Sequence, residues 1–306
     1  MRPLRGIALK LASVMVFIVM ASLIKFTAQH VPAGQAVFFR SFFAIPVIVA
    51  WLAWRKELAT GLKTVQPLGH VWRGVVGTLA MGLGFAGLGY LPLPEVTAIG
   101  YAAPLLTVIF AAMFLGEEVR MFRISAVILG MVGVLIVLAP RLSVDPETAG
   151  IAEALGAVLV LGGAVFAALA QVFVRKLVMT EQTSAIVFWF SVTATVMSLV
   201  TLPFGWVWPT PAEAAILVGA GLLGGLGQIL LTSSYREADA SLVAPFDYAS
   251  MIFALGIGYF VFGEQPTWPM LGGAALIVTA GILIIWRERQ LGLERARQRK
   301  AMTPQG

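Results

Sequence analysis

The feature that most constrains this chain is a series of long apolar segments separated by short polar connections. A helix needs about 20 mostly apolar residues to cross the hydrocarbon core of a bilayer, and several segments reach that length without a charge. They predict helices at 5–25, 35–54, 72–91, 95–115, 122–139, 153–175, 184–205, 213–235, 240–262 and 268–286. We therefore expect an all-α, polytopic membrane protein with ten transmembrane helices.

The composition agrees with this interpretation and excludes several kinds of site. Charged residues make up only 12% of the chain, about half of their share in soluble domains. Cysteine is absent, which excludes a disulfide, a thiolate metal site and a cysteine nucleophile. The two histidines, His30 and His70, are far apart in the sequence and form no set of metal ligands. We assign them no role and expect no metal and no cofactor.

The distribution of Lys and Arg predicts the orientation in the membrane. Cytoplasmic segments of membrane proteins carry an excess of these residues. If the N-terminus is cytoplasmic and ten helices follow, all but three of the 21 Lys and Arg residues fall on the inner side. The exceptions are Lys25, Arg40 and Arg141. We therefore expect both termini in the cytoplasm.

The chain also contains a weak internal repeat. A shift of 150 residues places Lys25 on Arg175, and a shift of 147 places Tyr101 on Tyr248. Other matches are Val37-Phe38-Phe39 with Val187-Phe188-Trp189 and Gly116-Glu117 with Gly263-Glu264. Each half holds five helices, an odd number, so the second half enters the membrane from the opposite side. Such inverted repeats are typical of secondary transporters with a site between the repeats; the alternative is a duplicated scaffold without a site.

The repeat divides the chain into four parts. The first five-helix repeat covers 1–139, an external linker covers 140–152, and the second five-helix repeat covers 153–286. A basic cytoplasmic tail follows at 287–306. The tail either lies on anionic lipid headgroups or is a solvated anchor of the topology.

Four short motifs in this order carry a resemblance to a known family. The first half holds Tyr-Ala-Ala-Pro-Leu at 101–105 and Phe-Leu-Gly-Glu at 114–117. The second half holds Ala-Pro-Phe-Asp-Tyr at 244–248 and Val-Phe-Gly-Glu at 261–264. With ten helices in two halves, this arrangement resembles the drug/metabolite transporter superfamily and, more narrowly, its EamA-type bacterial exporters.

The resemblance implies a carrier of the bacterial inner membrane that moves small metabolites by alternating access. It implies a monomer or weak dimer in the lipid bilayer, with a small-molecule substrate and no nucleic acid partner. The first, third, fourth, sixth, eighth and ninth helices of similar proteins line a central cavity. The chain is similar to exporters of aromatic and other amino acids, while other members carry riboflavin, sugars, nucleotide precursors or S-adenosylmethionine.

Two prolines within predicted helices are candidate hinges. A proline removes one backbone hydrogen bond of a helix, and Pro104 and Pro245 lie in the fourth and ninth helices. Tyr101 precedes Pro104 by three residues and Tyr248 follows Pro245 by three, so each tyrosine shares a helix side with its proline. We predict hinges at the prolines and a cavity that presents the tyrosine hydroxyls. The alternative is ordinary kinks with tyrosines at helix interfaces.

Charged residues within predicted helices are further candidates, because charges inside a membrane are costly and usually face water. Asp247 is the acid placed deepest. It would bind a substrate ammonium or couple transport to protons, unless it lies at the cytoplasmic interface. Lys25 and Arg40 either attract a substrate carboxylate or extend to the outer headgroups. Glu95 and Glu264 stand at helix ends, where we expect capping and topology roles.

Uncharged residues complete the predicted cavity. Gln171 and Gln228 lie within the sixth and eighth helices, where they either bond between helices or contact substrate. Phe85, Phe166 and Phe246 are candidates for an apolar lining, with core or lipid contact as the alternative.

The sequence favours a secondary transporter over other functions. A membrane enzyme needs clustered carboxylates, paired histidines or a nucleophile with its base, and a channel needs a filter or rings of charge; neither pattern occurs. No phosphate-binding Gly-x-x-x-x-Gly-Lys loop is present for a pump. We predict no enzyme activity and a carrier that exports small metabolites, foremost amino acids including aromatic ones, by rocking of its two halves. The alternatives are another metabolite, such as riboflavin, a sugar or a nucleotide precursor, and an integral membrane enzyme.

Overall fold

The computed structural model of the chain describes residues 3–115, 121–142, 150–177, 179–237 and 244–302. Within these residues the regular secondary structure is entirely helical, which confirms the expected all-α class. The helices are α1 (Pro3–Thr27), α2 (Ala33–Phe42), α3 (Ala44–Trp54), α4 (Leu58–Gly61), α5 (Pro67–Leu88), α6 (Leu93–Gly100), α7 (Ala102–Leu115), α8 (Met121–Leu142), α9 (Gly150–Leu177), α10 (Thr183–Leu199), α11 (Pro211–Glu237), η1 (Ala244–Tyr248), α13 (Ala249–Phe262) and α14 (Trp268–Met302).

Eight helical segments are long and apolar enough to cross a membrane. They correspond to eight of the ten predicted helices, and the other two correspond to shorter apolar helices, Thr183–Leu199 and Phe246–Phe262. The polytopic membrane fold is therefore confirmed, while the count of ten crossings stays a prediction. The helix α5 begins at Pro67 rather than at 72, so Arg73 lies in its second turn and not at its start.

Two predicted helices are interrupted in the middle. The second divides into α2 and α3 at Phe43, and the fourth divides into α6 and α7 at Tyr101. A proline follows three residues later in both cases, Pro46 and Pro104. Each proline lacks the N–H that would bond to the carbonyl four residues earlier, and that carbonyl belongs to the last residue of α2 or α6. The interruption associated with Pro104 therefore lies one turn before the proline, at Tyr101.

The ninth predicted helix, 240–262, also differs from the expectation. Its described part begins as a 3-10 turn, η1, and becomes α-helical only at Ala249. Pro245 lies in this turn and not inside an α-helix, and a hinge at Pro245 stays a prediction. Residues 240–243 are outside the described part of the chain. The discontinuity lies instead at the junction of η1 and α13, beside Tyr248.

The long helices pack in pairs that join the two predicted halves. α1 lies along α11 and α5 along α9, so the first helix of each half packs against the third helix of the other. α8 packs along α14, α2 against α10, and α6 against α13, which joins helices at corresponding positions. This exchange is the pattern expected for two halves related by a two-fold axis, as in inverted repeats.

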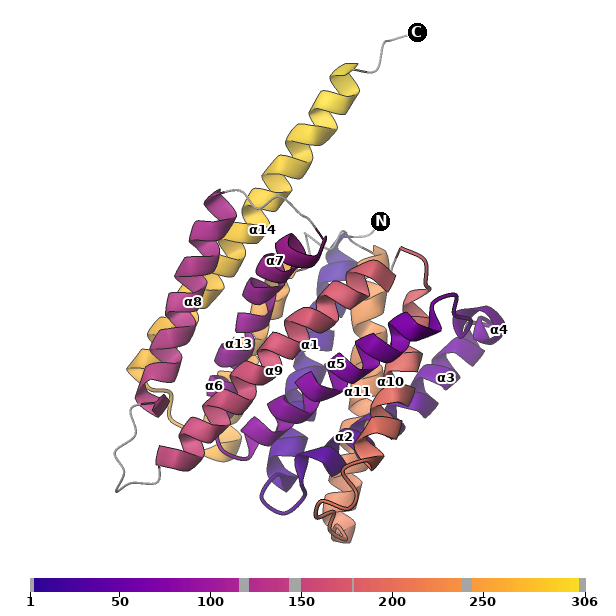
Figure 1. The fold of residues 1–306 in the computed structure, drawn as a ribbon, viewed down its shortest axis with the longest axis vertical. Coiled ribbons are helices and arrows are strands. Elements are labelled where there is room, and N and C mark those ends of the chain that lie inside the picture. Colours follow the sequence, from indigo (N-terminus) through magenta and orange to yellow (C-terminus); the bar gives the residue numbers. More distant parts are fainter. Residues whose placement is uncertain (1–2, 116–120, 143–149, 178, 238–243, 303–306) are drawn as a thin grey trace.

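Both ends of the described chain lie at the same end of the helical bundle (Figure 1). α1 begins there, and α14 projects beyond the other helices in the same direction. We call this the terminal end, and we call the opposite end, where α1 connects to α2 and α14 begins, the distal end. The assignment of the terminal end to the cytoplasm stays a prediction.

Two apolar cores stabilise the bundle, and two helices contribute to both. One core lies among α6, α7, α8, α9, α13 and α14, and the other among α1, α2, α5, α6, α11 and α13. In α13, for example, Met251 packs in the first core and Ala254 in the second. α6 and α13 therefore lie between the cores, which brings the discontinuities at Tyr101 and Tyr248 to the middle of the molecule.

Candidate functional site

A cavity of about 540 Å³ lies between α1, α7, α9, η1, α13 and α14. This volume is typical of small-molecule sites. Apolar side chains form most of the lining, among them Val14, Phe17, Ile18, Ala167, Ile284 and Ile285. The structure brings together five of the predicted site residues in this lining: Tyr101, Pro104, Gln171, Asp247 and Tyr248.

The two tyrosines that the internal repeat relates are in contact. Their ring centroids are 5.1 Å apart and the rings are 67° from parallel, an edge-on arrangement that aromatic pairs prefer. The Tyr101 hydroxyl lies within hydrogen-bonding distance of Ser250 Oγ and 3.4 Å from the Tyr248 carbonyl oxygen. Ser250 Oγ in turn donates to the Asp247 carbonyl oxygen at 2.6 Å. Ser250, which the sequence analysis did not single out, therefore connects Tyr101, at the break between α6 and α7, with η1.

Asp247 forms an ion pair at the cavity. Its Oδ1 is 2.7 Å from Lys10 Nζ of α1. The two side chains differ in surroundings, since Lys10 is 2% exposed and Asp247 is 51% exposed. The carboxylate therefore faces the cavity while the ammonium lies behind it. From the sequence, Lys10 was given only a role in membrane topology. Its position inside the first apolar segment could have indicated the ion pair, because a buried ammonium requires a partner.

Other predicted cavity residues lie elsewhere in the described structure. Gln228 borders a separate void of about 10 Å³ between α3, α10 and α11. Phe85 is buried in the core between α1, α2 and α5. Phe166 is half-buried in α9 and Phe246 half-buried in η1, each next in sequence to a lining residue. Arg40 is buried in α2, away from the headgroups that one interpretation assigned to it.

Lys25 closes a polar cluster at the distal end. Its Nζ is 2.9 Å from Glu264 Oε1 and donates to the Leu91 carbonyl oxygen at 2.6 Å. Glu264 also accepts the Leu93 N–H at the start of α6, at 2.9 Å. The expectation that Glu264 caps a helix is therefore met, although the helix is α6 and not its own. Lys25 is only 14% exposed and does not extend to headgroups, because carbonyls after the end of α5 and the acid bind it.

Arg141 closes a second polar cluster at this end. Its Nε and Nη2 donate to the two carboxylate oxygens of Glu95 at 2.9 and 2.7 Å, a bidentate geometry that is stronger than a single charged contact. Arg141 also pairs with Glu153. The cluster joins α6, α8 and α9 where they meet the distal surface.

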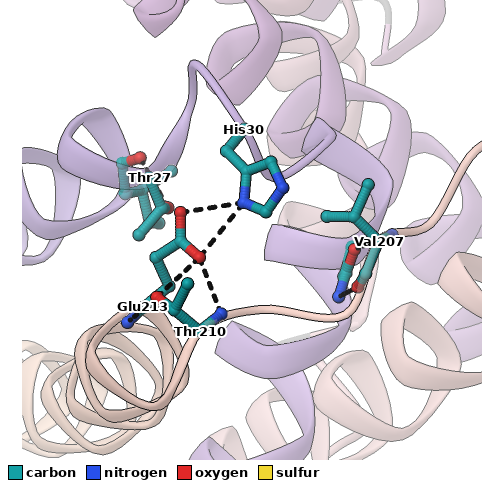
Figure 2. A network of polar contacts seen from close by, with 7 residues as sticks. Thr27, His30, Val207, Thr210 and Glu213 are labelled. Atoms are coloured by element: carbon teal, nitrogen blue, oxygen red, sulfur yellow. Dashed lines mark hydrogen bonds and ion pairs between the residues drawn. The ribbon is translucent and has the colours of Figure 1, made fainter.

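His30 takes part in a third contact at the distal end. Figure 2 shows Glu213, in the first turn of α11, between His30 and Thr210. The His30 Nδ1 is 2.9 Å from Glu213 Oε1, and the Thr210 N–H and hydroxyl both donate to Oε2 at 2.8 Å. The loop after α1 is thereby attached to α11. Together the three clusters join helices of both predicted halves at the distal end.

The comparison with protein families identifies the architecture. A model of the EamA-like transporter family matches residues 4–139 and 154–286, most of the chain. The chain belongs to the EamA-like transporter family. It is therefore a membrane transporter, as its resemblance to the drug/metabolite transporter superfamily predicted.

Relatives of this EamA-like chain are named for different molecules. It is 29% identical to an S-adenosylmethionine uptake transporter of Rickettsia bellii, over 87% of this chain and 88% of that protein. It is 30% identical to the pseudopaline exporter CntI of Pseudomonas aeruginosa, over 91% and 95%, and 31% identical to a riboflavin transporter of Rhizobium johnstonii, over 84% and 82%. Membership of the EamA-like family thus defines transport, and not the substrate.

A solved structure shares the fold of this EamA-like chain. It covers 94% of this chain and 98% of its own length with a TM-score of 0.66, at 19% sequence identity. At this identity the likeness concerns the fold alone.

Proposed function

We propose that this chain is a secondary carrier that exports small metabolites, foremost amino acids including aromatic ones, across the bacterial inner membrane. The observation that carries the proposal is the half-exposed carboxylate of Asp247 beside the Tyr101–Tyr248 pair in one cavity. A carboxylate suits the ammonium of an amino acid, and an aromatic pair with apolar walls suits its aromatic side chain.

The ion pair with Lys10 gives a way to exchange one cation for another. Without substrate, Lys10 compensates the charge of Asp247. A substrate ammonium that enters the cavity competes for the same carboxylate from its exposed side. A proton would compete in the same way, so the proposed coupling role of Asp247 and its role as an ammonium site use one chemical group.

The distal clusters and the placement of the cavity support alternating access. Gln171 of the lining is exposed and lies within the last two turns of α9, which ends at the terminal end of the bundle. The ion pairs of Lys25 and Arg141 join helices at the opposite end, which supports closure there. We propose that this conformation is open to the cytoplasm and that rocking of two inverted five-helix halves exposes the site to the other side.

Counterflow in proteoliposomes tests the proposal. Labelled phenylalanine is expected to exchange against unlabelled phenylalanine in a saturable manner, faster with a pH gradient if protons are coupled. Asp247→Asn is expected to abolish dependence on the gradient, while Glu57→Gln in an exposed loop serves as the control with the same change in charge. Absence of saturable counterflow for every amino acid would refute the substrate class. Exchange that ignores the gradient and survives Asp247→Asn would refute both roles of this residue.

A second candidate substrate is a larger planar metabolite such as riboflavin. The tyrosine pair and the apolar walls favour any flat ring system, and one relative is named as a riboflavin transporter. Inhibition of counterflow by riboflavin, but by no amino acid, would select this candidate over the first.

A further inference from the structure

Two arginines, buried Arg40 and half-buried Arg73, meet at Phe190 outside the lining of the cavity. Arg40 of α2 is 4% exposed. The Nε and Nη1 atoms of Arg40 and of Arg73, in α5, are inaccessible and have no hydrogen-bond partner. Both guanidinium groups lie over the ring of Phe190 in α10, with Cζ of Arg73 3.8 Å and Cζ of Arg40 5.7 Å from its centroid. Two like charges thus share one small interior space.

The two charges are not compensated within the described part of the chain. No acidic side chain there forms an ion pair with either arginine. A buried charge is costly unless it is paired, and arginine does not lose its proton in proteins. The Phe190 ring compensates a part of the cost through cation–π attraction, but the arginines also repel each other. An anion bound between the two arginines would compensate their charges.

The helices around the arginines provide room for their head groups. A Cβ built on Gly77 of α5 would lie 2.5 Å from Arg73 Nη1. A Cβ built on Gly224 of α11 would lie 3.2 Å from Arg40 Nε and 3.3 Å from Met20 Sδ. The space that side chains at these glycines would need is filled by the two guanidinium groups. Met20 belongs to α1, which also lines the cavity, so this helix passes close to the arginines and to the cavity.

We propose that Arg40 and Arg73 form an anion subsite of the carrier that takes the carboxylate of its substrate. This inference rests on the proposed function, in which the substrate is an amino acid. Guanidinium groups present paired donors that match the two oxygens of a carboxylate. The ammonium and the carboxylate of an amino acid are joined to the same carbon, so Asp247 in the cavity and the arginines outside its lining would act in turn. Asp247 attracts the ammonium in this conformation, and the arginines attract the carboxylate when the helices rock.

Thermal unfolding of the purified full chain in detergent tests the subsite. Sodium acetate, phosphate or chloride is added to a buffer whose only other anion is a bulky sulfonate. We expect acetate to raise the melting temperature of the wild type, because a ligand that binds only the folded state stabilises it. Arg73→Gln is expected to weaken acetate binding at least tenfold and, without acetate, to melt at the same temperature or higher, since one uncompensated charge is gone.

Two further variants complete the experiment. Arg55→Gln removes an exposed arginine that pairs with Glu57, and it is expected to keep the acetate effect. Arg73→Lys retains the charge without the planar group and is expected to bind acetate more weakly than the wild type. Should Arg73→Gln not fold, Arg40→Gln and Arg73→Lys give the same comparison.

The outcomes separate this inference from the proposed function. An acetate effect that is absent in the wild type, or that persists unchanged in every Arg40 and Arg73 variant, overturns the subsite, as does a chloride effect of equal size. If phenylalanine counterflow is then intact, the proposed function stands without the subsite. An acetate effect that depends on Arg73, without counterflow of any amino acid, supports an anion subsite and overturns the amino acid as its source.

Discussion

At the scale of single residues, the ion pair at the cavity is asymmetric. Lys10 is almost fully buried and Asp247 is half-exposed, so water can solvate the acid alone far better than the base alone. Asp247→Asn is therefore expected to destabilise the protein more than Lys10→Met, by about 1–3 kcal/mol. The double variant is expected to regain most of the loss, as unfolding midpoints in detergent will show. Equal losses in the two single variants, with no recovery in the double variant, would contradict the asymmetry.

Gly281 of α14 is a residue at which a single methyl group alters the cavity. A Cβ at this position would overlap the Tyr248 hydroxyl and its ring carbon Cζ, so Gly281→Ala must displace the tyrosine from its contact with Tyr101. We expect at least a tenfold loss of counterflow, with partial recovery in Gly281→Ala/Tyr248→Phe, which removes the hydroxyl. Gly272→Ala in the same helix, where a Cβ meets no atom within 4 Å, is the control. Unchanged counterflow in Gly281→Ala would place the substrate away from Tyr248.

At the scale of elements, a buried acid from the connection between α9 and α10 holds the backbone just before α5. Glu181 Oε1 accepts the N–H groups of Val65 and Gln66 at 2.7 and 2.6 Å and the Thr64 hydroxyl at 2.9 Å. Burial alone raises the pKa of Glu181, but the hydrogen bonds from Gln66, Thr64 and Val65 outweigh it and hold the pKa below its usual value.

The lowered pKa of Glu181 makes the stabilisation by these hydrogen bonds dependent on pH. Its stabilisation is complete above the carboxyl pKa of the unfolded chain, about 4.3, and is lost as the pH falls through the lower pKa of the folded state. Glu181→Gln is expected to lower the free energy of unfolding by about 1 kcal/mol at pH 7 and by progressively less below pH 4. Melting curves of the two proteins from pH 7 to 3.5 measure the difference; a constant gap would exclude the charge as its cause.

The helices were largely predictable from sequence, and their interruptions were not. Apolar length alone located each long segment to within a few residues, because the bilayer imposes that length. Pro104 correctly pointed to a discontinuity in the fourth helix, but the chain breaks where the missing hydrogen bond leaves a free carbonyl, beside Tyr101. For Pro245, the turn η1 replaced the expected helix, since a 3-10 start and an α-helical start have the same apolar pattern.

The side-chain partners were less predictable than the helices. Lys25 and Glu264 come from different halves of the chain, so only the folded structure shows that they pair. Lys10 and Arg73 were counted as topology charges because each lies near the start of its apolar segment. Their burial depends on the neighbouring helices, which a sequence pattern does not contain. The contact of Tyr101 with Tyr248 is the case in which the repeat did indicate a partner.

At the scale of the whole molecule, alternating access predicts that the distal ion pairs bias the conformation. Because the chain lacks cysteine, Gln171→Cys introduces a single label site on the cavity. We expect it to react with an impermeant maleimide from the cytoplasmic side. Glu264→Gln weakens the distal closure by about 1 kcal/mol, or about fivefold in the ratio of the two conformations, and is expected to reduce this labelling accordingly.

A charge outside the distal clusters, Glu57, provides the control for this labelling experiment. Glu57→Gln changes the same charge in a loop outside the distal clusters and is expected to leave the labelling rate unchanged. A labelling rate that Glu264→Gln leaves unaltered or increases would show that the distal clusters stabilise the fold without controlling access.

The helix that leaves the bundle, α14, has a practical consequence for imaging so small a transporter. Its 35 residues extend about 52 Å at 1.5 Å per residue, well beyond a hydrocarbon core of about 30 Å. A soluble helical protein joined in phase with its last turn would continue the same rod, with no flexible joint. Such a fusion would stand outside the detergent micelle as an orientation marker, and it would report the tilt of one half against the other in single-particle images.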